Sequence, residues 1–130
     1  MIEYKNITKE IIYTKLPEEI IKELLYWKEE CDKIKKHRLF KWHGRFDGYD
    51  VWINYSYKGN SNPEHNHTGF LSGVIYLNNK NDATHFIKDD ITFIGEKGDM
   101  VLFPSNLKHK VETQQEEYER VTFAFNINKT

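Results

Sequence analysis

From residue 38 to residue 127 the chain alternates short apolar and polar runs broken by turn residues, and this pattern constrains the fold most. Turn signals lie at Gly44, at 47–48 and at 59–63. Residues 49–57 alternate between apolar and polar side chains and predict a strand. Further strands are expected at 70–77, 84–87, 91–94, 100–103, 110–112 and 120–127. Short strands in this number and at this spacing predict a β-sandwich or jelly roll.

An amphipathic helix is expected before these strands, from about residue 16 to residue 36. Pro17 suits the first helical turn, and the acidic residues Glu18 and Glu19 interact favourably with the helix dipole there. The apolar residues that recur at helical spacing are Ile20, Ile21, Leu24, Leu25, Trp27, Cys31 and Ile34. We expect this face to cover one sheet, and residues 2–14 to add one or two short strands.

The length and the aromatic content bound the domain organisation. A chain of 130 residues suits a single domain with one core. Aromatic residues make up 15% of it, which favours large side chains packed between sheets. We therefore expect one mainly β (α+β) domain over 1–130, with helical support at about 16–36 and a β core at about 38–127.

Charge and cysteine content exclude several classes of protein. The formal net charge is −1, which provides no bulk attraction for nucleic acid. Cys31 is the single cysteine, so no disulfide can form within the chain and a reducing compartment is expected. The first five residues do not resemble a secretory signal, and no apolar run is long enough to span a membrane. We expect a cytoplasmic protein with no nucleic-acid or membrane partner.

Two histidines, His65 and His67, follow the Gly/Asn/Pro-rich turn. Side chains two residues apart on an extended segment point to the same face, so their ring nitrogens can converge on one metal ion. The His-x-His pattern is short and common, however. Taken alone, it indicates two exposed loop histidines more strongly than a metal site.

The segment 98–109 strengthens the case for a metal site. It comprises a Gly-Asp turn, a strongly apolar strand, a Pro-Ser bend and then His109, a layout that can return a late histidine to the side of an early pair. Three histidines on one side of an ion leave positions open for a substrate and dioxygen. Similar sets also bind zinc, so the residues do not select the metal. The remaining histidines are interpreted as surface or packing residues: His37, His43 and His85.

The expected last strand carries an arginine on a small, polar face. Arg120, Thr122, Ala124 and Asn126 share that face by the two-residue period of a strand. A guanidinium suits a carboxylate, which it can bind through two parallel hydrogen bonds, and the Thr122 hydroxyl can add a third. The alternative is a surface arginine. Its partners would be Glu116, Glu117 or Glu119.

In this order and spacing the motifs resemble a family of small 2-oxoglutarate/Fe(II)-dependent oxygenases from bacteria and phage, related to the prolyl hydroxylases. The resemblance covers roughly residues 50–127. It implies a double-stranded β-helix (a jelly roll) with helices against one sheet, in the cytoplasm of a bacterium or a phage-infected host. It also implies an iron ion bound through His65 and His109, and an arginine, Arg120, that binds the distal carboxylate of the cosubstrate 2-oxoglutarate.

Two tyrosines gain a role from the same resemblance. Tyr76-Leu77-Asn78 is similar to a segment of the prolyl hydroxylases whose tyrosine also touches the cosubstrate carboxylate. A second tyrosine that often contacts the cosubstrate is matched best by Tyr57. The resemblance thus implies a cosubstrate site that comprises Arg120, Thr122, Tyr76 and Tyr57.

His67 departs from the pattern of the wider superfamily, in which the second ligand is a carboxylate. A neutral ligand in that place leaves more positive charge on the iron. We expect it to strengthen binding of the 2-oxoglutarate dianion and to weaken binding of Fe(II). The alternative is that His67 is not a ligand and that water or another residue fills the position.

The resemblance implies a dioxygenase that uses Fe(II), 2-oxoglutarate and dioxygen to hydroxylate a C–H bond of a small molecule or a protein side chain, releasing succinate and CO2. A second hypothesis is a cupin, because Gly59, the His-x-His pair and the later Gly98, Pro104 and His109 also resemble the two cupin motifs. The glutamate that a cupin has shortly after His-x-His is absent, and a cupin has no need of Arg120. A third hypothesis is a jelly-roll binding module without a metal.

Overall fold

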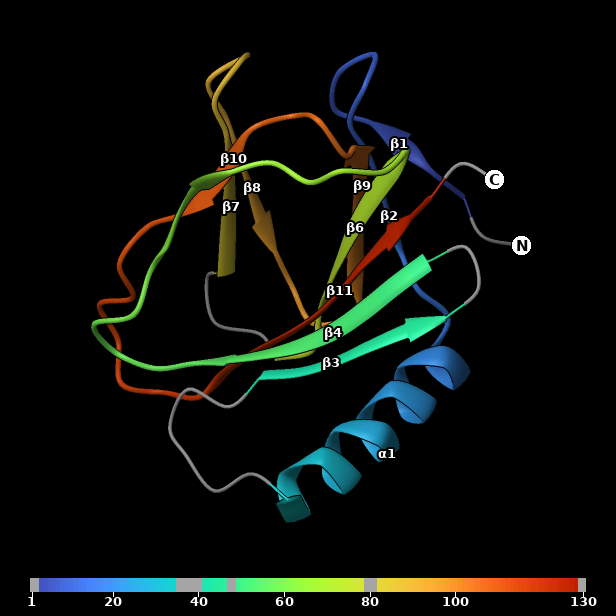
Figure 1. Ribbon diagram of the computed structural model, residues 1–130, viewed down its shortest axis with the longest axis vertical. Coiled ribbons are helices and arrows are strands. Elements are labelled where there is room, and N and C mark those ends of the chain that lie inside the picture. Colours follow the sequence, from blue (N-terminus) through green and yellow to red (C-terminus); the bar gives the residue numbers. More distant parts are fainter. Residues whose placement is uncertain (1–2, 35–40, 47–48, 79–81, 129–130) are drawn as a thin grey trace.

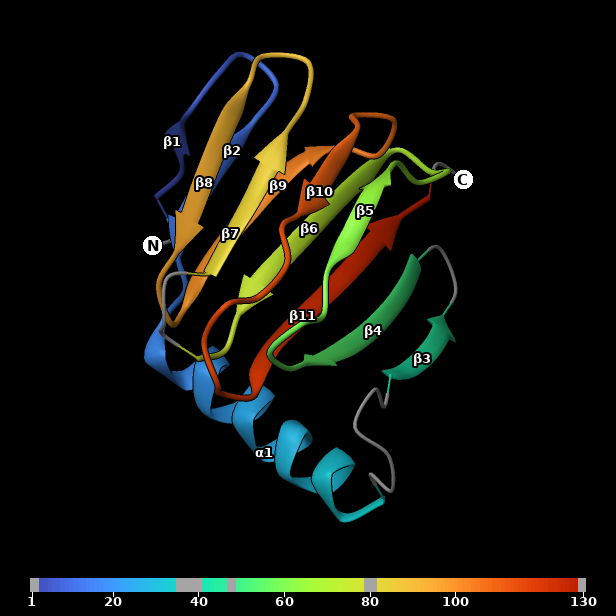
Figure 2. The ribbon, with the colours of Figure 1, turned by 90° about the vertical axis from the view of Figure 1, so that its left-hand side faces the viewer.

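The computed structural model describes residues 3–34, 41–46, 49–78 and 82–128. Within these residues the chain forms two antiparallel sheets that face each other, with helix α1 on the outer face of the larger sheet (Figures 1 and 2). The strand order is β1-β2-β9-β6-β11-β4-β3 in the larger sheet and β5-β10-β7-β8 in the smaller one. The predicted mainly β jelly roll with an N-terminal helix on one sheet is confirmed.

The elements follow the predicted order along the chain. Their bounds are β1 Lys5–Asn6, β2 Ile12–Lys15, α1 Glu18–Ile34, β3 Lys41–Phe46, β4 Tyr49–Ser56, β5 Asn62–His65, β6 Leu71–Tyr76, β7 Asp82–Phe86, β8 Ile91–Gly95, β9 Asp99–Pro104, β10 His109–Val111 and β11 Arg120–Ile127. None of the described helices is both long and apolar enough to span a membrane.

Of the predicted turns, one lies within a strand and another overlaps one. Gly44 is inside β3, where it pairs with Val51 of β4, so the prediction of a turn there was wrong. The predicted turn at 59–63 ends early, because β5 already begins at Asn62 and includes Pro63. A proline is tolerated there since β5 is the edge of the smaller sheet, where an unpaired position needs no N–H donor. The predicted turn at 47–48 and the helix end at 35–36 lie outside the described residues, as does His37.

Strand alternation divides the apolar side chains of the larger sheet between two cores. One core lies under the helix and joins Ile21 and Cys31 of α1 to residues such as Ile75 and Val121. Cys31 is therefore a packing residue, and its burial raises the pKa of its thiol. The other core lies between the sheets and comprises Ile11, Tyr76, Phe86, Phe93, Val101, Phe103 and Leu107.

In the core between the sheets, the ring of Tyr76 packs directly against the backbone of Gly95 in β8. A Cβ atom at Gly95 would overlap that ring. Tyr76 is fully buried and its hydroxyl lies 2.6 Å from the Thr84 hydroxyl, so the ring cannot move aside into free space. Position 95 therefore has no room for a side chain.

We expect Gly95→Ala to destabilise the protein by about 1–3 kcal/mol, the usual cost of overpacking a filled core. Urea unfolding monitored by circular dichroism measures the change. Ile94→Ala is the matched control on the same strand, because the Ile94 side chain is 61% exposed. Its effect should stay within about 0.5 kcal/mol. Equal effects of the two substitutions would contradict this account of the core.

Candidate metal centre and carboxylate pocket

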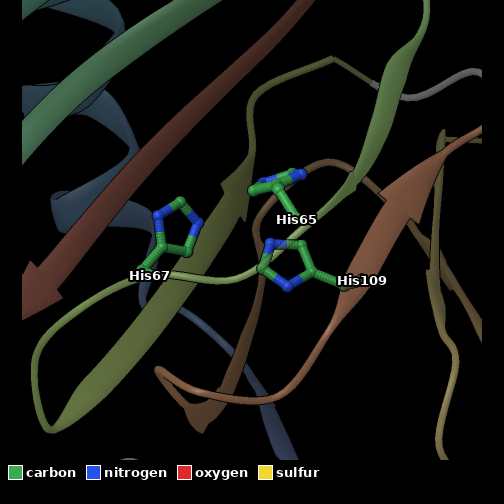
Figure 3. A group of neighbouring side chains, drawn as sticks. All are labelled: His65, His67 and His109. Carbon is green, nitrogen blue, oxygen red and sulfur yellow. The ribbon is translucent and has the colours of Figure 1, made fainter.

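The three predicted histidines meet at the edge of the smaller sheet (Figure 3). His65 ends β5 and His109 begins β10, and the antiparallel pairing of these strands places the two residues directly opposite each other. Their ring centroids are 4.2 Å apart, and the ring of His67 lies 4.9 Å from His65 and 5.2 Å from His109. One potential ligand atom from each residue lies within 4.8 Å of the others. The arrangement can hold one metal ion.

Backbone carbonyl groups orient two of the three rings. Nδ1 of His65 lies 2.7 Å from the Pro63 carbonyl oxygen, and Nδ1 of His109 lies 2.9 Å from that of Leu107. Because a carbonyl oxygen only accepts, each Nδ1 carries the proton and each Nε2 keeps its lone pair for a metal. The loop that carries His67 is tied down as well, since its N–H donates to the Ser105 carbonyl at 2.8 Å.

His109 is held in the neutral form that binds metals. Its side chain is buried against Phe103, with ring centroids 4.8 Å apart. The pKa of His109 is lowered to about 4, chiefly by burial and also by the nearby His65 and His67, while the bond to the Leu107 carbonyl opposes the shift. At neutral pH the ring is therefore uncharged.

A cavity of about 320 Å³ lies between the sheets, and the histidines line it. Its floor is formed by β4, β11 and β6, whose registers set side chains in rows. Along β11, three pairs with β4 succeed one another at every second residue: Arg120 with Ser56, Thr122 with Asn54, and Ala124 with Trp52. Trp52 lies beside the three histidines, with its ring centroid 5.5 Å from that of His67. Arg120 is four residues from Ala124 along β11, about 14 Å of strand.

The Arg120 end of the cavity is a pocket suited to a carboxylate. Arg120 is only 9% exposed, which excludes the alternative of a surface arginine. Burial lowers the pKa of its guanidinium, which nonetheless stays charged at neutral pH. The Thr122 hydroxyl is buried and has no hydrogen-bond partner among the described residues. Arg120 and Thr122 are thus the two predicted cosubstrate residues that line the cavity. Tyr76 pairs with Thr122 in the sheet, but its side chain is buried in the core between the sheets and its hydroxyl lies 2.6 Å from that of Thr84.

Tyr57, the fourth predicted residue, does not line the cavity either. Its hydroxyl donates to Oε2 of Glu119 at 2.6 Å, and its ring packs against the core under the helix. Strand parity explains this placement. On β4 the even-numbered residues such as Trp52 and Asn54 face the cavity, while the odd-numbered Ile53 and Tyr55, and Tyr57 just beyond the strand, belong to the core under the helix.

Sequence reasoning did not assign a role to Asn126, which lines the same cavity. Its Oδ1 accepts a hydrogen bond from the Ser72 hydroxyl at 2.6 Å, and Ser72 lies 2.9 Å from the Ser105 hydroxyl. The Asn126 side chain is buried, yet its amide nitrogen has no partner among the described residues. The signal was present, because Asn126 shares the face of β11 with Arg120. His85 lies elsewhere, with Nδ1 at 2.8 Å from the Thr92 hydroxyl; the side chain of His43 lies outside the described residues.

A family model described as "Putative 2OG-Fe(II) oxygenase" matches residues 78–126. This confirms the resemblance predicted from the motifs. The matched region includes His109, Arg120 and Thr122. It begins after His65 and His67 in the chain, so it does not include them. No curated protein matches the chain.

Solved structures share the fold at low sequence identity. A prolyl-4-hydroxylase from Pseudomonas putida is 15% identical, with a TM-score of 0.69 over 95% of this chain and 89% of that one. HygX from Streptomyces hygroscopicus, solved with nickel and 2-oxoglutarate bound, is 8% identical, with a TM-score of 0.72 over 89% and 81%. A cupin superfamily protein from Desulfitobacterium hafniense is 11% identical, with a TM-score of 0.56 over 73% and 82%.

The geometry predicts one divalent first-row ion per chain. We expect His65→Ala, His67→Ala and His109→Ala each to lower metal affinity by more than the ten- to hundredfold that is typical of groups outside the coordination sphere. Calorimetric titration of the apo-protein with Co(II) measures the affinity. His85→Ala is the control and should bind Co(II) like the wild type. An unchanged affinity of His67→Ala would refute the three-histidine site.

Proposed function

We propose that this relative of the 2-oxoglutarate/Fe(II) oxygenases is itself an Fe(II)- and 2-oxoglutarate-dependent dioxygenase that hydroxylates a C–H bond. The observation that carries the proposal is the shared cavity. Three histidines converge on one side of it, and the buried guanidinium of Arg120 lies at its end. A metal site and a carboxylate site in one enclosed space suit a cosubstrate that needs both.

The histidines fit an Fe(II) ion. Three neutral nitrogen ligands on one face leave positions open for a bidentate cosubstrate and dioxygen, as in facial sites that contain two histidines and a carboxylate. Replacing the carboxylate by His67 leaves more positive charge at the centre, which favours a dianion. When bound, the iron supplies the dioxygen chemistry that side chains cannot perform, and the protein supplies binding, orientation and exclusion of water.

Arg120 and its neighbours orient the cosubstrate. The guanidinium donates two parallel hydrogen bonds to the distal carboxylate of 2-oxoglutarate, and the Thr122 hydroxyl donates a third. Tyr76, which pairs with Thr122, packs in the adjacent core, where its hydroxyl lies 2.6 Å from that of Thr84. With that carboxylate bound, the keto-acid end points along β11 toward the histidines. In the overall reaction one oxygen atom of O2 enters succinate and the other enters the new hydroxyl group, while the cosubstrate loses CO2.

The primary substrate would occupy the part of the cavity beyond the histidines, away from Arg120. Trp52 offers an apolar surface there, and the amide nitrogen of Asn126 is a buried donor held in place by Ser72. A buried donor without a partner costs free energy, so an acceptor oxygen on a small molecule or a protein side chain would be favoured beside it.

The cupin hypothesis shares the fold but makes no use of the carboxylate pocket. The cupin superfamily neighbour supports the architecture alone, at 11% identity. A cupin that acts without a cosubstrate would not need a buried arginine at the end of the cavity. Arg120 therefore distinguishes the two hypotheses.

We expect Arg120→Ala to weaken binding of 2-oxoglutarate by roughly two to four orders of magnitude, since truncating one partner of a buried charge pair costs about 3–5 kcal/mol. Metal affinity should remain close to that of the wild type. Arg120→Lys should recover part of the affinity, because an ammonium group cannot reproduce the fork. Titration of Co(II)-loaded protein with the unreactive analogue N-oxalylglycine measures each value.

Lys110→Ala provides a charge control, because Lys110 pairs with Glu112, a group that is 76% exposed. It should leave N-oxalylglycine affinity unchanged. Equal affinities of wild type and Arg120→Ala, or no binding to the wild type, would favour the cupin hypothesis.

Activity can be tested without knowledge of the substrate. We expect the Fe(II)-loaded wild type to form succinate slowly from 2-oxoglutarate in the presence of O2 even when no substrate is added. Arg120→Ala should abolish this turnover at cosubstrate concentrations that saturate the wild type. Succinate formation that is independent of O2 or of iron would contradict the proposal.

A further inference from the structure

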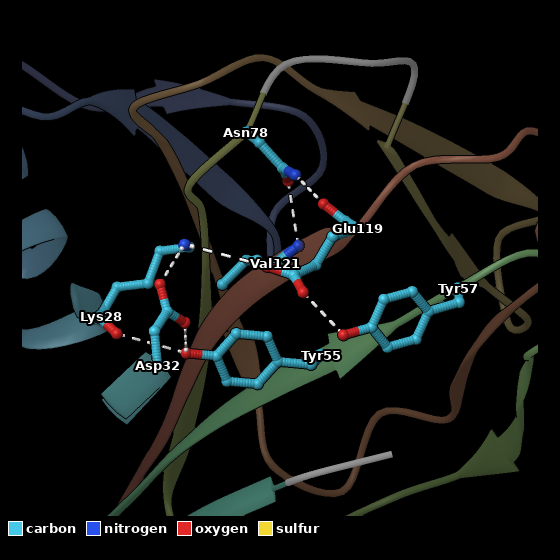
Figure 4. A network of polar contacts seen from close by, with 7 residues as sticks. All are labelled: Lys28, Asp32, Tyr55, Tyr57, Asn78, Glu119 and Val121. Carbon is cyan, nitrogen blue, oxygen red and sulfur yellow. Dashed lines mark hydrogen bonds and ion pairs between the residues drawn. The ribbon is translucent and has the colours of Figure 1, made fainter. Parts of the chain in front are cut away.

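The side chain of Asn78 binds the backbone on both sides of Arg120 (Figure 4). Its Nδ2 donates to the carbonyl oxygen of Glu119, and its Oδ1 accepts from the N–H of Val121 at 3.0 Å. Asn78 lies two residues after the end of β6, and Arg120 is the first residue of β11. One amide therefore holds the two peptide groups that flank the arginine.

The ladder between β6 and β11 ends two residues before it would pair Asn78 with Arg120. Its registered pairs run from Leu71 with Ile127 to Tyr76 with Thr122. Past the pair of Tyr76 with Thr122, the N–H of Leu77 still donates to the Val121 carbonyl at 3.2 Å. After that, the side-chain amide of Asn78 supplies the hydrogen bonds to β11 and to Glu119 just before it. Without Asn78 the backbone at Arg120 would keep its pairing with Ser56 of β4 and lose the side-chain bonds on the β6 side.

Glu119 adds an anchor on the opposite face of the sheet. Its Oε2 accepts from the Tyr57 hydroxyl at 2.6 Å, and its Oε1 lies 3.9 Å from Nζ of Lys28 in helix α1. Lys28 in turn lies 2.8 Å from Asp32, which accepts from the Tyr55 hydroxyl at 2.6 Å. The strand start from which Arg120 enters the cavity is thus tied to β6 by Asn78 and to the helix layer by Glu119.

We propose that Asn78 and Glu119 are positioning residues that set where the Arg120 guanidinium lies in the cavity, and that they thereby set cosubstrate affinity. The inference rests on the proposed function. Its physical basis is the rigid fork of arginine, which binds a carboxylate in two parallel hydrogen bonds only when its base is correctly placed. Misplacement by a fraction of an ångström is enough to weaken such an arrangement.

The test uses Asn78→Ala, which removes both backbone bonds. Co(II)-loaded full-length protein is titrated with N-oxalylglycine, and Co(II) affinity and the thermal midpoint are measured in parallel. We expect N-oxalylglycine affinity to fall at least tenfold while Co(II) affinity changes less than twofold. Asn78→Asp keeps the acceptor for Val121 and loses the donor to Glu119, so its affinity should lie between those of Asn78→Ala and the wild type.

A matched pair of tyrosine variants tests the helix-side anchor. Tyr57→Phe removes the hydroxyl that binds Glu119 and should weaken N-oxalylglycine binding several-fold. Tyr55→Phe removes a hydroxyl that binds Asp32 of α1 and reaches Glu119 only through Lys28, so it should weaken N-oxalylglycine binding less than Tyr57→Phe does. Equal loss of affinity in the two variants would overturn the role of Glu119.

The remaining outcomes separate this inference from the proposed function. No binding of N-oxalylglycine to the wild type would overturn the proposed function itself. Binding to the wild type with equal affinity for Asn78→Ala would leave the function standing and overturn the positioning role. Parallel loss of Co(II) and N-oxalylglycine affinity in Asn78→Ala would show general destabilisation and would also overturn it.

Discussion

The two-residue alternation of β11 is the constraint on which the rest of the structure depends. It lies between β4 and β6, so its backbone is paired on both sides and its register cannot slip without exchanging the faces. Val121 lies in the core under the helix, while Arg120 and Thr122 line the cavity. One strand therefore contributes to the hydrophobic core on one face and to the candidate carboxylate pocket on the other.

The candidate metal centre depends on a second pairing, that of β5 with β10. Opposite residues in an antiparallel pair have side chains on the same face, which brings His65 to His109 although 44 residues separate them in the chain. Carbonyl groups of Pro63 and Leu107 select the tautomers, and burial keeps His109 neutral. The two pairings belong to different sheets, and the cavity between the sheets is where their side chains meet.

Local pattern predicted most of the elements and the identity of the histidines and of Arg120, because strand alternation and turn residues are visible in the chain itself. It failed where tertiary pairing overrides a local signal. Gly44 lies in a strand because β4 pairs with it, and β5 includes Pro63 because an edge strand tolerates proline. Tyr57 was assigned by similarity to a tyrosine contact, but it follows the odd-numbered residues of β4 and packs against the core under the helix.

By itself the sequence determined the strand periodicity, the three candidate ligands and the face shared by Arg120 and Thr122, since each follows from neighbours along one segment. Only the tertiary structure decided that the ligands converge, that Arg120 is buried in their cavity, and that Asn78 and Glu119 hold its backbone. Those facts join residues tens of positions apart, such as Asn78 and Val121, and depend on strand register and sheet stacking. Alternation specifies which face a residue occupies, and pairing specifies what it meets there.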